Sequence, residues 1–115
     1  MKRIFLSLPM HGKSDEEILN TIEFMKKRVR AYYNGEEIVF VDNFIITTDE
    51  AFECASCKHS RLAFLSKALT KLANCDVIAI LSNEDVDQGK HPGVLVESMC
   101  AKYYGIDIYY IYPNE

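Results

Sequence analysis

The sequence predicts an α/β fold in which a parallel sheet is covered by helices and joined by right-handed crossovers. Two observations predict it. Short apolar runs alternate with longer segments of helical periodicity along the chain. The run at 77–82 is almost continuously apolar, which is typical of a strand buried on both faces in a parallel sheet. With 115 residues and no linker-like stretch, 1–115 is predicted to form a single domain.

The first half of the chain reads as strand, helix and strand. Lys2 to Leu8 has the β-rich composition of a short strand. Ser14 to Glu17 forms a capping box, in which the Ser and Glu side chains satisfy unpaired N–H groups at a helix start. Apolar residues then recur at helical spacing: Ile18, Ile22, Met25, Val29 and Tyr32. Asn34-Gly35 ends this helix, and Glu36 to Val41 forms the second strand.

The second half adds two helices and two strands. Phe44 to His59 shows no period and is predicted to be a loop, of a length typical of a functional lid or a mobile segment. Leucines mark the next helix: Leu62, Leu65, Leu69 and Leu72. After the buried strand, Asn83 to Pro92 is a polar loop, Gly93 to Tyr104 is a helix and Ile106 to Tyr112 is the last strand.

Charge and composition restrict the class of function. Thirteen basic and 17 acidic residues give a net charge of −4, which disfavours a general binder of nucleic acid or anionic membranes. No apolar run has the length of a membrane span, and the apolar stretch at the N-terminus is too short for a signal peptide. We therefore expect a soluble, cytoplasmic protein.

The cysteines are expected to be free thiols of a reducing compartment. Cys54, Cys57 and His59 have metal-like spacing, but no second pair of ligands completes a tetrahedral site. A loop with free thiols is therefore favoured over a zinc site or a redox pair, and no metal or other cofactor is predicted. Cys75 and Cys100 lie in patterns that indicate burial.

Three segments are expected to meet beyond the carboxyl ends of the strands, where open α/β sheets bind ligands. Their candidate ligand-binding residues are Ser7, Pro9, Met10, His11, Gly12, Asp42, Asn43, Ser82, Asn83, His91 and Gly93. The turn from Ser7 to Gly12 precedes a helix, so its N–H groups suit a phosphate or carboxylate.

Each candidate also has a structural interpretation. Ser14 is expected to cap its helix, Asp42-Asn43 are common turn formers, and His91 could be a solvated surface residue. Asp76 is expected to open its strand by bonding to backbone groups. Glu97 differs because it lies one turn into a helix and apolar residues flank it. Two interpretations stand side by side: a buried functional carboxylate, or a carboxylate that compensates the helix dipole.

Three blocks of sequence resemble one family. Phe5-Leu-Ser-Leu-Pro-Met-His-Gly12 resembles the Y-I-S-G-P-M-x-G opening of the nucleoside 2-deoxyribosyltransferase-like superfamily, particularly its small phage and bacterial branch. Leu72-Ala-Asn-Cys-Asp-Val-Ile-Ala-Ile-Leu81 is similar to its L-x-x-A-D-V-V-x-x-x strand. Gly93-Val-Leu-Val-Glu97, with Ala101 and Gly105, is similar to its G-A-x-x-E-x-x-x-A-x-x-x-G helix. The blocks keep the family order and span nearly the whole chain except 44–60.

The resemblance implies a Rossmann-like (flavodoxin-like) three-layer sandwich with about four to five strands and attack on an N-glycosidic bond. Glu97 corresponds to the nucleophile, which forms a glycosyl ester that water or a second base resolves. In related hydrolases the first βα turn binds a 5′-phosphate. Near the sugar's 5′ end, His91 replaces an Asp of the nucleoside transferases or a Ser of phosphate-preferring hydrolases, which favours a nucleotide. Asn43 or Asn83 is expected to orient the base or sugar.

The chain also departs from the family. Phe5 replaces a tyrosine that orients the nucleophile, and Ala68 replaces a helper aspartate, so a catalytically lapsed nucleotide-binding protein is the alternative hypothesis. A structural or interaction role is a third. Leu8 and Val94 replace a Gly and an Ala of the motifs. We also expect a homo-oligomer, because relatives complete their sites with a neighbour's residues and the C-terminal strand is rich in tyrosine.

Overall fold

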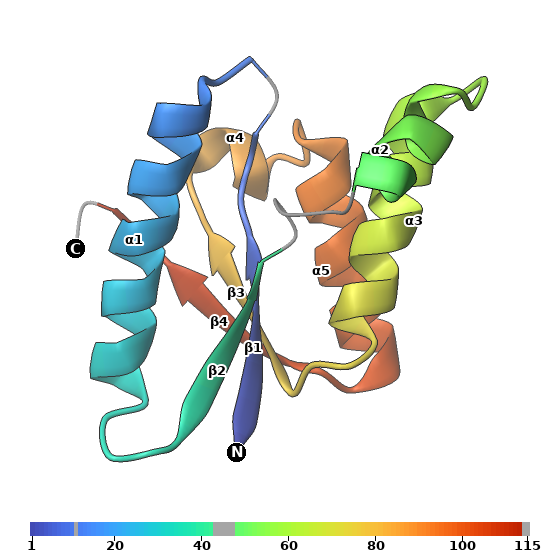
Figure 1. Cartoon of the computed structure of the whole chain (residues 1–115). Helices are drawn as coiled ribbons and strands as arrows, with labels where there is room; N and C mark the ends of the chain where they lie inside the picture. The colour runs from blue at the N-terminus through green and yellow to red at the C-terminus, as the bar shows by residue number, and fades with distance from the viewer. Residues whose placement is uncertain (11, 43–47, 114–115) are drawn as a thin grey trace.

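The computed structural model describes residues 1–10, 12–42 and 48–113, and Figure 1 shows how their elements are arranged. In chain order these elements are β1 (Lys2–Ser7), α1 (Asp15–Tyr32), β2 (Ile38–Asp42), α2 (Thr48–Ala55), α3 (Ser60–Leu72), β3 (Val77–Leu81), α4 (Glu84–Asp87), α5 (Pro92–Tyr104) and β4 (Asp107–Ile111). None of these helices is both long and apolar enough to cross a bilayer.

The four strands form one all-parallel sheet in the order β2-β1-β3-β4. Helix α1 covers one face, and α3 and α5 cover the other (Figure 1). This confirms the predicted α/β fold and its three-layer, flavodoxin-like arrangement. After β2 the chain returns to the other side of β1, so β1 and β3 are the neighbouring strands at which the order reverses. Ligands of such sheets bind in the crevice beyond the carboxyl ends of these two strands.

Helix α1 and the sheet enclose an apolar core. The helix begins as the capping box predicts, because the Ser14 hydroxyl accepts a hydrogen bond from the Glu17 N–H at 3.1 Å. Its apolar stripe packs on the sheet through residues that are all fully or nearly fully buried: Ile18, Ile22, Met25 and Val29 from the helix, with Ile4, Leu6, Leu8, Val77, Ala79 and Ile111. We call this surface of the sheet the α1 face.

The opposite surface, which we call the α3/α5 face, uses the alternate strand positions. Phe5, Ile78 and Ile80 of the sheet pack there against Leu72 of α3 and against Val94 and Ala101 of α5. Because side chains alternate along a strand, Ser7 lies on the same face as Phe5. The last residue of β1 therefore directs a polar side chain toward α5.

Two predicted loops contain helices. Thr48–Ala55 forms α2 inside the segment 44–59, so the prediction of a loop is wrong there. The helix has acidic residues in its first turn and buries Cys54, which is 1% exposed. Glu84–Asp87 forms the short α4 inside the polar loop. Cys75 and Cys100, whose patterns indicate burial, are half-buried and pack against the α3/α5 core, while Cys57 is exposed.

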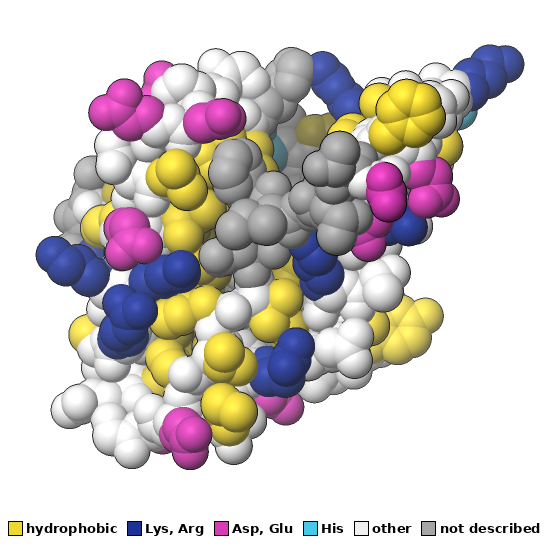
Figure 2. All heavy atoms as spheres, in the orientation of Figure 1, with side chains coloured by type: hydrophobic (Ala, Val, Ile, Leu, Met, Phe, Trp, Pro, Cys, Tyr) yellow, Lys and Arg dark blue, Asp and Glu magenta, His cyan; other side chains and the backbone are white. Residues whose placement is uncertain are grey.

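The surface carries both signs of charge. Figure 2 shows basic and acidic side chains interspersed over the visible face, with apolar side chains between them. On the face shown in Figure 2, this pattern differs from the contiguous basic stripe that is typical of nucleic-acid binding.

Candidate active site

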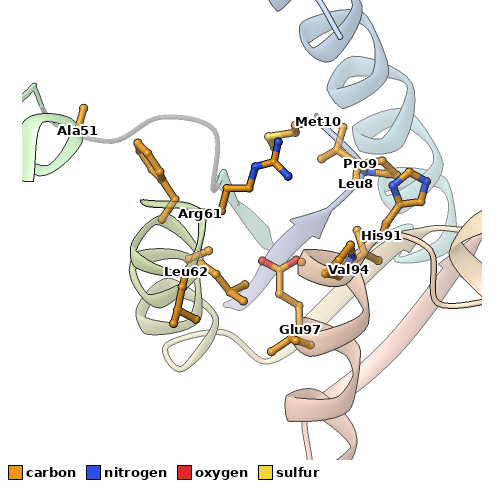
Figure 3. A pocket seen from close by; sticks show the side chains of 15 residues that line it. Leu8, Pro9, Met10, Ala51, Arg61, Leu62, His91, Val94 and Glu97 are labelled. Carbon is orange, nitrogen blue, oxygen red and sulfur yellow. The ribbon is translucent and has the colours of Figure 1, made fainter. Parts of the chain in front are cut away.

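A cavity of about 820 Å³ lies beyond the carboxyl end of β1, between α3 and the start of α5. Its size is within the range of sites for small molecules, which is roughly 300–1,000 Å³. Three stretches of chain line it: Leu8, Pro9 and Met10 after β1; Ala51, Arg61, Leu62, Phe64, Leu65 and Ala68 from α2 and α3; and His91, Pro92, Gly93, Val94, Val96 and Glu97 from α5 and the residue before it. Figure 3 shows the cavity from close by.

Glu97 lies on the sheet-facing stripe of α5. Val94, Glu97 and Ala101 are spaced three and four residues apart, so they share one face of the helix, and all three are buried. The Glu97 side chain is only 3% exposed, yet it lines the cavity. In Figure 3 its carboxylate points into the cavity. A carboxylate at this depth meets a ligand without a full layer of competing water.

Ser7 holds this carboxylate. The Ser7 hydroxyl is fully buried and donates a hydrogen bond to Glu97 Oε1 at 2.6 Å. This short hydrogen bond between two buried side chains fixes the orientation of Glu97. From the sequence, Ser7 was predicted to contact an anion of the ligand. In this structure its hydroxyl proton is donated to Glu97 instead.

The remaining candidates separate into three groups: residues that line the cavity, described residues that do not, and residues outside the described part of the chain. Pro9, Met10, His91 and Gly93 line the cavity, and their role in ligand binding stays a prediction. Gly12 has a φ of +79°, a left-handed conformation that favours glycine, and it is not among the lining residues. His11, Asn43 and the side chain of Asp42 lie outside the described part of the chain.

Ser82 and Asn83 have structural roles in the loop after β3. The Ser82 hydroxyl donates to Asp87 Oδ1 at 3.0 Å, and the Asn83 side chain accepts from the Val86 N–H at 2.9 Å. Asn83 thereby caps α4. Both side chains stabilise the turn that leads toward α5, and neither is among the residues that line the cavity.

Arg61 was not among the site residues predicted from the sequence. This residue lies in the first turn of α3, and Figure 3 shows its guanidinium reaching into the cavity on the side opposite α5. Arg61, Leu65 and Ala68 are spaced four and three residues apart, so they share one helix face, and all three line the cavity. That spacing is the signal that could have placed Arg61 with the apolar residues of α3.

Polar groups at the amino ends of the strands stabilise the fold. Asp76 Oδ2 accepts a hydrogen bond from the Arg3 N–H at 2.8 Å, which confirms the structural role predicted for Asp76. Burial raises the pKa of the neighbouring Cys75 thiol, an effect that the Arg3 guanidinium partly opposes. This thiol is therefore a weaker nucleophile than an exposed one.

Within the described residues, no three His, Cys, Asp or Glu side chains gather where they could hold a metal ion. Glu97 and Arg61 are instead the charged side chains that this part of the chain presents to the cavity. Comparisons with protein-family models, with curated proteins and with solved structures found no match to this chain.

Proposed function

We propose that this protein cleaves the N-glycosidic bond of a deoxynucleoside or its 5′-monophosphate, or transfers the sugar to a second base, with Glu97 as nucleophile. The observation that carries the proposal is a single buried carboxylate, held by Ser7, at the wall of a cavity of about 820 Å³. The resemblance of the three sequence blocks to the nucleoside 2-deoxyribosyltransferase-like superfamily supports the same assignment.

In this mechanism a carboxylate oxygen of Glu97 attacks the anomeric carbon of the sugar while the bond to the base breaks. The base leaves with the electron pair of that bond and takes up a proton from solvent. The resulting glycosyl ester is then attacked by water, which gives the free sugar, or by a second base, which gives a new nucleoside. In both cases the attacking group returns a proton to solvent and the Glu97 carboxylate is restored. Ser7 is the positioning residue, because its hydrogen bond keeps one oxygen of Glu97 fixed during both steps.

The walls of the cavity suit the two parts of a nucleoside. Leu62, Leu65 and Ala68 present apolar surface from α3, which favours a flat, weakly hydrated base. His91, immediately before α5, can donate a hydrogen bond to a polar group of the sugar or its phosphate.

The test incubates the protein with a panel of deoxynucleosides and their 5′-monophosphates and measures the released free base by chromatography. We expect Glu97→Gln to lower the rate at least about 1,000-fold, because the amide keeps the shape of the side chain but is not a nucleophile. Glu16→Gln removes a carboxylate from the exposed first turn of α1 and is the matched control. No release by the unchanged protein, or equal release by Glu97→Gln, would refute the enzyme assignment.

A binding protein without turnover is the second candidate. Phe5 is fully buried beside the α5 stripe and has no hydroxyl, and Ala68 contributes a methyl group to the cavity wall. Family members carry a tyrosine and an aspartate at these positions, so the helper groups of the reaction are missing. Calorimetry with the same panel separates the candidates: saturable binding without released base supports this one, and absence of binding eliminates it.

A further inference from the structure

We propose that Arg61 selects substrates that carry a phosphate on the sugar, by binding that phosphate from the α3 side of the cavity. This inference rests on the proposed function and deepens it, because it assigns the anion to a residue outside the turn that follows β1.

The hydrogen bonding of Ser7 argues against an anion next to β1. A hydroxyl has one proton, and that of Ser7 is donated to Glu97 Oε1 at 2.6 Å. A nucleophilic carboxylate is ionised, so a phosphate placed beside this pair would face a like charge in a poorly screened interior. The favourable position for an anion is therefore away from Ser7 and Glu97.

Arg61 supplies a cation in the same cavity, from a different helix than Glu97. It is the sole Lys or Arg among the described residues that line the cavity. Its guanidinium reaches into the cavity from α3, whereas Glu97 belongs to α5 on the other side (Figure 3). The guanidinium is planar and presents a fork of N–H donors that matches two oxygens of a phosphate.

The substrate geometry agrees with this placement. In a nucleoside 5′-monophosphate the sugar ring separates the anomeric carbon from the phosphate, so the nucleophile and the phosphate-binding group must act on different parts of the ligand. Glu97 and Arg61 lie on separate helices that face the same cavity. One ligand can therefore meet both charges without bringing its phosphate onto the carboxylate.

The experiment compares the dissociation constants of four deoxynucleoside 5′-monophosphates with those of the four matching deoxynucleosides, measured by calorimetry on the unchanged chain and on Arg61→Gln. A charge-assisted pair of hydrogen bonds corresponds to about a 10- to 100-fold difference in affinity. We expect Arg61→Gln to weaken monophosphate binding by that factor and to weaken nucleoside binding much less. Arg61→Lys should recover part of the loss, because it restores the charge without the fork.

Lys58→Gln is the matched control, because it removes the same charge from the exposed connection between α2 and α3, outside the cavity lining. Equal affinity of the unchanged chain for both ligand classes, or a preference that survives in Arg61→Gln, would overturn the assignment of Arg61 while base release by Glu97 could still stand. A preference for monophosphates that is lost in Arg61→Gln but kept in Lys58→Gln supports the assignment of Arg61. This holds even if no base is released, because that result contradicts only the proposed reaction. If neither the monophosphates nor the nucleosides bind, both the assignment of Arg61 and the proposed function are overturned.

Discussion

The two faces of the sheet are built from alternate residues of the same strands, but they end differently at the carboxyl edge. On the α1 face the contribution of β1 is apolar throughout, with Ile4 and Leu6 followed by the buried Leu8. On the α3/α5 face Phe5 is followed by Ser7, which donates to Glu97 at the edge of the cavity. The candidate site therefore lies on the α3/α5 face, where the apolar residues of β1 end in a polar one. On the α1 face the apolar residues continue past the end of the strand.

The largest expected effect on folding lies on the α1 face. Met25 is fully buried in that core, so Met25→Ala should lower the free energy of unfolding by about 2–5 kcal/mol. Urea unfolding followed by circular dichroism measures this. Leu19→Ala on the same helix, where the side chain is 49% exposed, should change stability much less. A comparable loss in both variants would show that the α1 core is not as closely packed as described.

A smaller effect is expected from the polar pair on the α3/α5 face. Ser7→Ala removes a hydrogen bond from a buried carboxylate and should cost about 1–3 kcal/mol in the free energy of unfolding. Replacing both partners, in Ser7→Ala with Glu97→Leu, should recover much of that loss because no buried carboxylate is left.

The same denaturant titrations provide this double-mutant cycle. A double variant whose loss equals the sum of the two single losses would contradict a direct interaction between the two side chains. The double variant should also release no base, which separates the stability of this face from its chemistry.

The smallest effect concerns Tyr33, which packs against the α1 core and stacks edge-on with Tyr32 at 4.8 Å. Burial raises the pKa of Tyr33 above its ordinary value of 10.0, with additional contributions from Tyr32, Asp107, Glu36 and Tyr109. The folded state therefore retains the proton more strongly than the unfolded state does. This stabilisation is complete below pH 10.0 and decreases as the pH rises through the raised pKa.

Tyr33→Phe should accordingly lose less stability than the unchanged chain when the pH is raised above 10.0. Urea midpoints on both sides of that pH measure the difference. Tyr104→Phe is the control, because Tyr104 is 83% exposed. Parallel pH profiles for the unchanged chain and Tyr33→Phe would contradict the assignment.

The elements with strong local signals were predictable. The capping box at Ser14 and the Asn34-Gly35 stop delimit α1, and the apolar run at 77–82 identifies the central strand β3. Helix α2 was not predicted because it has only eight residues, and its largest apolar side chain, Phe52, is 77% exposed. A helix this short has too few turns for its period to be recognised in the sequence.

The candidate site was predictable in part. The apolar neighbours of Glu97 indicate a buried carboxylate, and its 3% exposure confirms the burial, while its catalytic role stays a prediction. Its partner Ser7 is 90 positions away in the chain, so no local pattern joins the two residues. Arg61 was missed because a basic residue at a helix start is normally solvated, and only the packing of α3 beside α5 brings it to the cavity.

The attachment of α3 has an evolutionary consequence. Its C-terminal half packs on the sheet through Ala68, Leu69 and Leu72, whereas Leu62 near its start is 64% exposed. Exposed positions accept substitutions more readily than buried ones. Changes near the start of α3 would therefore alter one wall of the cavity and leave the Glu97 carboxylate and Ser7 untouched. Descendants of such a chain can vary that wall while they inherit the same buried pair.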